Sequence, residues 1–258
     1  MIADLRATGA LARRSLAQTF RYPRYLAPIV IFPSLFLAVN TGGAGRATSL
    51  PGFPEVHGFL DFEVAAAMLQ STMLAGISTG IAVGIDVERG FLDRLVAAPV
   101  SRPVVITGRL AATALMGVFT GVWFLSIALI CGAHIRGGAL GVLQVMALLS
   151  LSALSFGGLG AALSLRAGNA SLAQGMFPLV AVVLFVSSAF FPQELMQEPA
   201  QTIAIWNPLS LIADGVREPI IDGASWSSFG RGIGGVAILA ALSAVLAALA
   251  LRHRLRSG

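Results

Sequence analysis

The chain has 258 residues, of which 56% are hydrophobic and 11% are charged, and its mean hydropathy is +0.84. Because a soluble domain of average composition carries about 25% charged residues, these values exclude water as the main solvent of the folded chain. The net charge of +5 comes from 17 arginines and no lysine, and these arginines flank apolar blocks instead of forming one basic face, which excludes nucleic acid as a partner.

Residues 1–24 predict an amphipathic helix at the cytoplasmic face of a membrane. At about 100° per residue, six small or apolar side chains fall on one narrow arc, and arginines lie beside them. Pro23 lacks the N–H that a helix interior needs, so the helix should end before it. The arc consists of Ile2, Leu5, Gly9, Ala12, Leu16 and Phe20.

Six apolar blocks follow, each long enough, or nearly so, to cross the roughly 30 Å hydrocarbon layer of a bilayer. With six spans and a cytoplasmic N-terminus, all but four of the 17 arginines lie on the cytoplasmic side, as the positive-inside rule requires. The four exceptions are Arg46, Arg136, Arg217 and Arg231. The six apolar blocks are residues 25–40, 62–85, 104–131, 139–165, 172–191 and 233–251.

We therefore predict an all-α polytopic membrane protein with a single transmembrane domain over residues 1–258. Six transmembrane helices would follow the amphipathic helix, with both termini in the cytoplasm. The expected location is the plasma (inner) membrane of a bacterium. Residues 192–231 mix apolar and polar side chains, and we interpret them as an extracellular re-entrant or surface segment with short helices between spans five and six.

The second span carries a face of small residues and several polar residues, and each set has two possible roles. Gly76, Gly80 and Gly84 form a small-xxx-small face, which favours packing within the chain over a contact between two copies. Gln70 and Thr72 avoid lipid, so they line a substrate path or form hydrogen bonds inside the helix bundle.

The sequence lacks residues that several kinds of chemistry need. Without lysine there is no P-loop lysine, so this chain is not a conventional ATPase by itself. No HExxH pair occurs and Cys131 is the only cysteine, which argues against a metal site and against an enzyme. No charged residue lies in the middle of a predicted span, which argues against an ion-coupled carrier. The energy for transport must then come from another polypeptide.

The connection between spans two and three, residues 86–103, is predicted to be a cytoplasmic handle for that polypeptide. Asp86 is a candidate N-cap for a short helix that ends at Pro99. Glu88 falls near the apolar arc of this helix, where a carboxylate needs a partner, either a local arginine or a donor on another subunit.

Two stretches carry a resemblance to a known family. The stretch ERGFLDRLVAAPVSRPVVITGRL, from Glu88 to Leu110, is similar to the cytoplasmic loop of ABC-2 type permeases. These are membrane subunits of bacterial ABC exporters related to daunorubicin-type drug-export permeases. The distal pattern of residues 190–192, 206–210 and 214–217 resembles the same family, and its candidate residues here are Phe191, Pro192, Asn207, Pro208 and Arg217.

The resemblance implies a coupling helix that docks into a separate ATP-binding subunit, which would bind ATP and Mg²⁺, so that this chain needs no cofactor. The assembly would contain a second permease subunit, identical or related, in contact with membrane lipid. The residues that map onto the coupling segment are Glu88, Arg89, Gly90, Leu92, Arg94, Pro99, Ser101 and Arg102.

The function expected from this resemblance is export of a hydrophobic or amphipathic substrate, such as a drug, a lipid or a polyketide-like molecule. The main alternative is an autonomous channel or an ion-coupled secondary transporter. A third class is a membrane-embedded enzyme or a scaffold that transports nothing.

Overall fold

A computed structural model describes residues 2–90 and 102–257, and within these ranges the chain contains helices and turns but no strand. The predicted all-α class is therefore confirmed. The elements are α1 (Ile2–Arg21), α2 (Pro23–Ala44), η1 (Gly45–Ser49), α3 (Phe59–Glu88), α5 (Arg102–Ile130), α6 (Gly138–Ala167), α7 (Ser171–Phe185), η2 (Gln193–Leu195), α8 (Ala200–Trp206), α9 (Pro208–Ile221) and α10 (Trp226–Ser257).

Five helices are long and apolar enough to cross a membrane in the described part of the chain: α2, with the short helix that follows it, α3, α5, α6 and α10. The fifth predicted span, residues 172–191, forms only the 15-residue helix α7 and then an irregular turn. At about 1.5 Å per residue, α7 is roughly 22 Å long, which is shorter than the apolar block predicted. Ser187 donates from its Oγ to the Leu184 carbonyl at 2.5 Å, so the chain leaves the helix through a serine-capped turn.

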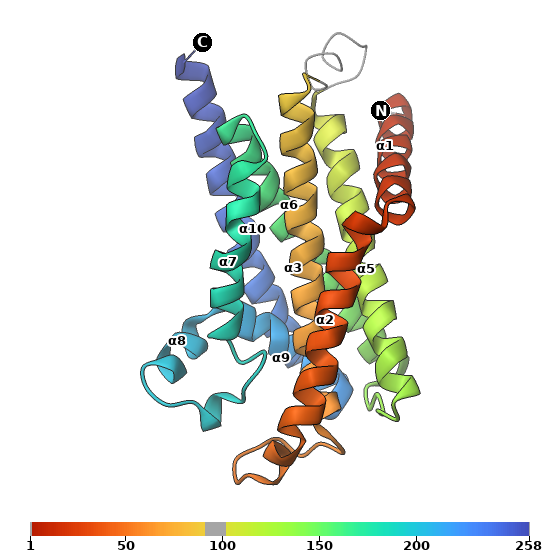
Figure 1. Ribbon diagram of the computed structural model, residues 1–258, viewed down its shortest axis with the longest axis vertical. Coiled ribbons are helices and arrows are strands. Elements are labelled where there is room, and N and C mark those ends of the chain that lie inside the picture. Colours follow the sequence, from red (N-terminus) through yellow and green to blue (C-terminus); the bar gives the residue numbers. More distant parts are fainter. Residues whose placement is uncertain (1, 91–101, 258) are drawn as a thin grey trace.

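The bundle is built around α3, which packs against α2, α5, α6, α7 and α9 (Figure 1). In the most apolar window of α3, 72% of residues are buried, against 17% in that of α2, which lies at the edge. Phe62, Phe124 and Phe156 are fully buried between the helices. In lipid this close packing stabilises helix association by van der Waals contact, because the hydrophobic effect gives little advantage to one apolar neighbour over another.

The two ends of the bundle differ in charge. Both termini, the end of α3, the start of α5 and the α6–α7 turn lie at one end, which we call the arginine-rich end (Figure 1). The α2–α3 and α5–α6 connections and α8 lie at the opposite end. This arrangement agrees with the alternation of loops that the arginine distribution predicts.

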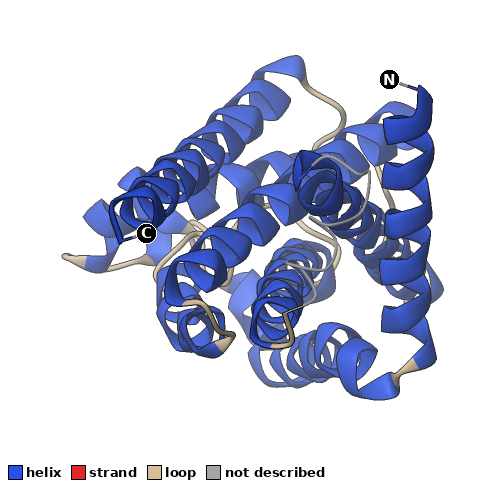
Figure 2. Ribbon diagram, turned by 90° about the horizontal axis from the view of Figure 1, so that it is seen from above, coloured by secondary structure: helices blue, strands red, loops and turns tan. Residues whose placement is uncertain are grey.

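Helix α1 ends before Pro23 as predicted, and part of the predicted arc packs. Ala12 is buried, Leu16 packs against the cluster that contains Ile29 and Met116, and the centre of the Phe20 ring lies 5.0 Å from that of Phe119 in α5. Gly9 is exposed, as is Phe20 at 46%, whereas Leu11 and Thr8 contact the α5 backbone at Gly108. The packed side therefore includes part of the predicted arc and extends to Thr8 and Leu11. Figure 2 shows α1 lengthwise along one side of the bundle. Its position at a membrane interface stays a prediction.

Within residues 192–231, the segment predicted to be re-entrant or at the surface, one helix packs into the bundle. Helix α9 packs against α3, α6 and α10. Its buried apolar residues recur at helical spacing, which gives one continuous apolar face for the bundle. They are Leu209, Ile212, Ala213, Val216 and Ile220.

Candidate functional site

The end of α3 is joined to the start of α7 by a single side chain. The Oε1 atom of Glu88 accepts a hydrogen bond from the backbone N–H of Ala170 at 2.9 Å. Ala170 is the N-cap of α7, where backbone N–H groups lack partners within the helix and favour a negative charge. Among the described residues, the partner of Glu88 is thus the α6–α7 turn of the same chain, which the sequence did not indicate.

An ion pair joins α3 to α5 at the same end. Arg109 donates from Nη2 to Oδ2 of Asp86, and both side chains are less than a fifth exposed. The prediction that Asp86 caps a separate helix is wrong, because α3 continues unbroken to Glu88 and Asp86 lies in its last turns. Its carboxylate is used between helices instead.

Glu88, Arg89 and Gly90 close α3 and begin the predicted coupling segment. Arg89 is exposed, and Gly90 has φ of +62°, a left-handed conformation that favours glycine and lets the chain turn away from the helix. Arg102 begins α5. The remaining predicted coupling residues, Leu92, Arg94, Pro99 and Ser101, and the side chain of Arg102 lie outside the described residues.

The three glycines of the second span face α6 and the turn that follows it. A Cβ atom at Gly76 would lie 2.4 Å from Cβ of Phe156, and one at Gly80 would lie 2.6 Å from Cα of Gly160. At Gly84 the corresponding approach is 2.4 Å, to Cα of Ala170. Helices α3 and α6 can pack this closely only because these positions carry no side chain, so they form one rigid pair.

The polar residues of α3 form hydrogen bonds to α2 and α5. Thr72 bonds Thr120 of α5 at 3.0 Å between Oγ1 atoms, and Thr79 bonds Thr113 of α5 at 2.7 Å. Gln70 is 3% exposed, and its Oε1 has no partner among the described residues. Thr72 thus lies in a helix contact, whereas Gln70 keeps a free acceptor inside the bundle.

A second arginine is buried toward the opposite end. Arg217 of α9 donates to the carbonyls of Phe62, Ser188 and Ala189 at 3.2, 2.9 and 2.6 Å, and to Oδ1 of Asp214 at 3.0 Å. Its guanidinium also lies 3.8 Å from the centre of the Phe62 ring, an arrangement that attracts a cation. The irregular turn after α7 thus has its free carbonyls satisfied by one side chain.

Arg217 was counted from the sequence as an outer loop residue, and its burial was not foreseen. Glu63, which is 1% exposed, was also missed; it accepts from Asn40 of α2 at 2.7 Å, and its other oxygen has no partner among the described residues. The Asp214 and Arg217 spacing of three residues was the available signal, since it places both on one helix face.

The other residues of the distal pattern have local roles. Asn207 caps α9 by accepting from the Leu209 N–H at 2.9 Å, and it donates to the Val183 carbonyl of α7 at 2.7 Å. Pro208 is the first residue of α9, where its missing N–H costs nothing. Phe191 is 58% exposed, whereas Pro192 is buried.

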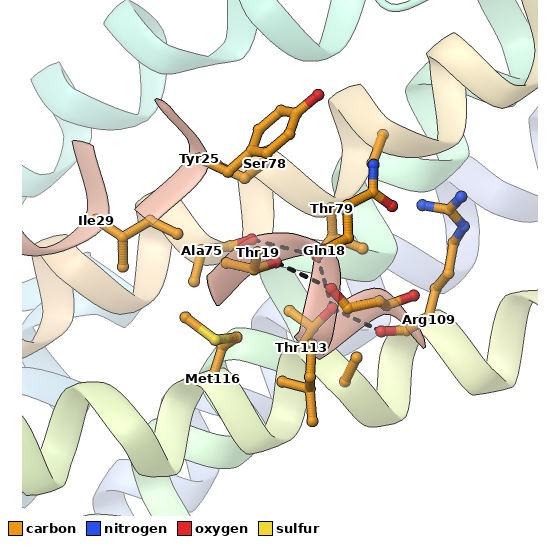
Figure 3. Close-up of a pocket in the computed structure, with 14 residues that line it drawn as sticks. Gln18, Thr19, Tyr25, Ile29, Ala75, Ser78, Thr79, Arg109, Thr113 and Met116 are labelled. Atoms are coloured by element: carbon orange, nitrogen blue, oxygen red, sulfur yellow. Dashed lines mark hydrogen bonds between the residues drawn. The ribbon is translucent and has the colours of Figure 1, made fainter. Parts of the chain in front are cut away.

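A small cavity of about 60 Å³ lies between α1, α2, α3 and α5 (Figure 3). Ile29, Ala75 and Met116 form one side of it, and Arg109 lies on the other. Thr79 and Thr113 lie between these two sides. The cavity therefore combines an apolar surface with a charged group that also belongs to the α3–α5 ion pair.

The comparisons with known proteins agree with these features. The model of the family described as ABC-2 type transporter matches residues 6–221. The daunorubicin resistance ABC transporter permease protein DrrB1 of Streptomyces coeruleorubidus is 27% identical over 206 residues, covering 80% of this chain and 71% of the relative. Heme exporter protein B of Rhodobacter capsulatus is 30% identical over 197 residues, covering 69% of this chain and 86% of the relative. With a match that runs from α1 to the end of α9, this multi-pass membrane protein belongs to the ABC-2 type transporter family and is the membrane subunit of an ABC transporter.

Proposed function

We propose that this membrane subunit exports a hydrophobic or amphipathic molecule, driven by ATP hydrolysis in a separate ATP-binding subunit. The observation that carries the proposal is the set of contacts at the arginine-rich end. The Asp86 to Arg109 ion pair and the Glu88 to Ala170 hydrogen bond connect the two borders of the predicted coupling segment to α3, α5 and α7. A partner that pulls on this segment would move three helices together.

Binding of ATP to the partner would favour one of two conformations of the membrane subunit, because a ligand shifts an equilibrium only through its different affinity for the two states. The α3–α6 pair would move as a rigid body, since its backbones are too close to slide past one another. The name of one relative states export, and that of the other states drug resistance, which supports transport out of the cytoplasm.

The proposed assembly contains two membrane subunits, identical or related, and ATP-binding subunits that hold ATP and Mg²⁺. The arginine-rich end would lie in the cytoplasm of a bacterium, with both termini on that side of the inner membrane. The half-exposed and exposed apolar side chains of α2 and α7, such as Leu35 and Leu179, are available for lipid or for the second subunit.

The test is charge reversal at the coupling segment. Glu88→Arg with Arg94→Glu should abolish stimulation of the partner's ATPase activity and reduce its recovery in a pull-down. Glu218→Arg is the matched control, because Glu218 pairs with Arg231 at the opposite end. If the double variant stimulates and recovers the partner as well as the wild-type chain does, this segment is not the coupling site.

Glu63 gives a specific reason to keep an ion-coupled carrier as the second candidate function. A carboxylate that is buried inside a membrane bundle, and of which one oxygen has no partner in the described part of the chain, is the type of group that binds protons in such carriers. The chain alone, reconstituted without nucleotide, would then transport substrate in response to a pH gradient, and Glu63→Gln would remove that transport. Absence of transport without ATP would eliminate this candidate.

A further inference from the structure

A groove lies on the flank of the bundle where α6 packs against both α5 and α10. It holds about 410 Å³, and leucine, alanine, valine and glycine residues form most of its surface. The polar side chains among the described residues that line it are those of Ser155 and Ser243. Ser155 donates its hydroxyl to the Leu151 carbonyl of its own helix at 3.0 Å. A ligand in this groove therefore meets an almost entirely apolar surface.

The groove lies in the half of the bundle that is nearer the arginine-rich end. On α6 it runs from Leu151 to Leu165, which at about 1.5 Å per residue is roughly 20 Å, and α6 ends at Ala167. On α5 it includes Leu110, in the first turns of that helix. One leaflet of a bilayer has a hydrocarbon depth of about 15 Å, half of roughly 30 Å. The groove is therefore long enough for an extended acyl chain of the leaflet at that end.

Three exposed alanines form the α10 side of the groove: Ala240, Ala244 and Ala247. Alanine reaches only one carbon beyond the backbone, so the helix surface is recessed along this line. Leu151 of α6, at 40% exposed, stands at the border of the recess. Atoms that face an empty recess lose van der Waals contacts, and no water is present at this depth of a bilayer to fill it. A lipid chain restores these contacts.

The end of the groove is positively charged. Arg166 directly follows the lining residue Leu165 and is exposed. The last turns of α10, beyond Ala247, carry three more arginines, and the sequences of α5, α6 and α10 contain neither aspartate nor glutamate. The three are Arg252, Arg254 and Arg256. Basic residues at the end of membrane helices attract the headgroups of anionic lipids, so the charge here selects an anionic headgroup.

We propose that this groove binds an anionic phospholipid of the leaflet next to the arginine-rich end. One acyl chain lies along α6 between α5 and α10, and the phosphate lies at the level of Arg166. A lipid without net charge can fill the recess as well, so the preference comes from the headgroup. This binding needs neither ATP nor a partner subunit, and it does not depend on the proposed export function.

Native mass spectrometry of the full chain in detergent measures the preference. Phosphatidylglycerol and phosphatidylcholine with the same acyl chains are titrated separately at low ionic strength. Phosphatidylglycerol should bind at least about fivefold more tightly, the factor that one arginine near an anionic headgroup contributes. Added salt should reduce this preference, because it screens exposed charges. Equal affinities for the two lipids at low ionic strength would overturn the proposal.

A pair of arginine variants locates the headgroup. Arg166→Gln should weaken binding of phosphatidylglycerol about fivefold and leave that of phosphatidylcholine unchanged. Arg46→Gln is the matched control, because Arg46 is also exposed but lies in the α2–α3 connection at the opposite end (Figure 1). The same loss in both variants would mean that phosphatidylglycerol responds to the net charge of the chain and not to this site.

Substitutions that fill the groove locate the acyl chain. Ala244→Trp places an indole in the recess and should abolish tight binding of phosphatidylglycerol. Ala241→Trp is the matched control, because Ala241 is exposed on the same helix but does not line the groove. If Ala244→Trp does not fold, Ala244→Leu and Ala241→Leu give the same comparison with a smaller side chain. Equal binding to the variants at positions 244 and 241 would show that the lipid binds elsewhere.

The same spectra test a second copy of the chain as the rival occupant. Dimers of the lipid-free chain that Ala244→Leu removes and Ala241→Leu retains would make the groove a contact between copies, and the lipid proposal would be wrong. An oligomeric state that is the same in both variants, with phosphatidylglycerol binding lost only at position 244, supports the lipid site.

Discussion

The two ends of the bundle each contain an arginine that pairs with an aspartate, Arg109 partly buried and Arg217 fully buried, but the surroundings of the two arginines differ. Arg217 donates to three backbone carbonyls and one carboxylate, and it lies against the Phe62 ring. Among the described residues, Arg109 binds one carboxylate, that of Asp86 on a different helix, at the edge of a cavity. An arginine with many short-range partners fixes a fold, whereas an arginine with one partner on another helix can change that partner when the helices move.

The largest expected effect is at Arg217. Arg217→Met would leave the carbonyls of Ser188 and Ala189 and the carboxylate of Asp214 without a donor, which we expect to lower the free energy of unfolding by about 3–5 kcal/mol. Thermal unfolding in detergent measures this change. Arg217→Lys keeps the positive charge but not the several N–H donors of the guanidinium, so it should lower the free energy of unfolding less than Arg217→Met does. A melting temperature for Arg217→Met equal to that of the wild-type chain would show that this cluster does not hold the fold.

The second prediction concerns the helix pair that connects the two ends. Gly80→Ala should lower the free energy of unfolding by about 1–3 kcal/mol, because the new Cβ would lie 2.6 Å from the Gly160 backbone. Gly234→Ala in α10 meets no atom within 4 Å and has the same effect on helix propensity, so it serves as the control. Equal unfolding profiles for the two variants would mean that α3 and α6 are not in such close contact.

A smaller effect on stability is expected at the α3–α5 ion pair. Asp86→Asn and Arg109→Gln should each lower the free energy of unfolding by about 1–2 kcal/mol, and the double variant by less than the sum. Their effect on coupling to the ATP-binding subunit should be larger than their effect on stability. If the losses of unfolding free energy are additive and stimulation of the ATPase is normal, Arg109 has no role in coupling that Arg217 lacks.

The smallest effect is expected where both partners face solvent or headgroups. Arg231 is 57% exposed in its pair with Glu218, so Glu218→Gln should change the free energy of unfolding by less than about 0.5 kcal/mol. The same unfolding assay checks it. A change as large as that at Arg217 would indicate that this end of the bundle is stabilised by its surface charges and not by its buried cluster.

The sequence predicted those features that depend on local pattern. The apolar blocks predicted the long helices, and the arginine distribution predicted which loops share one end of the bundle. The spacing of Gly76, Gly80 and Gly84 predicted a packing face. Each of these follows from composition or periodicity within one segment, so no knowledge of distant contacts was needed.

The features that were missed depend on contacts between distant segments. Arg217 bonds Phe62 across 155 positions of the chain, and Glu88 bonds Ala170 across 82. No periodicity within α3 or α9 carries information on such partners. The early end of α7 was missed for a related reason, since hydropathy continues to Phe191 while the backbone turns at Val186 to meet α9.

The short length of α7 has a consequence for the surrounding bilayer. A helix of roughly 22 Å is shorter than a hydrocarbon layer of about 30 Å. Most of its side chains are exposed on the single chain, so a bilayer in contact with them would have to become thinner to cover its apolar surface. In the proposed export function, a molecule that left the bundle beside α7 would have less hydrocarbon to cross before it reached the headgroups.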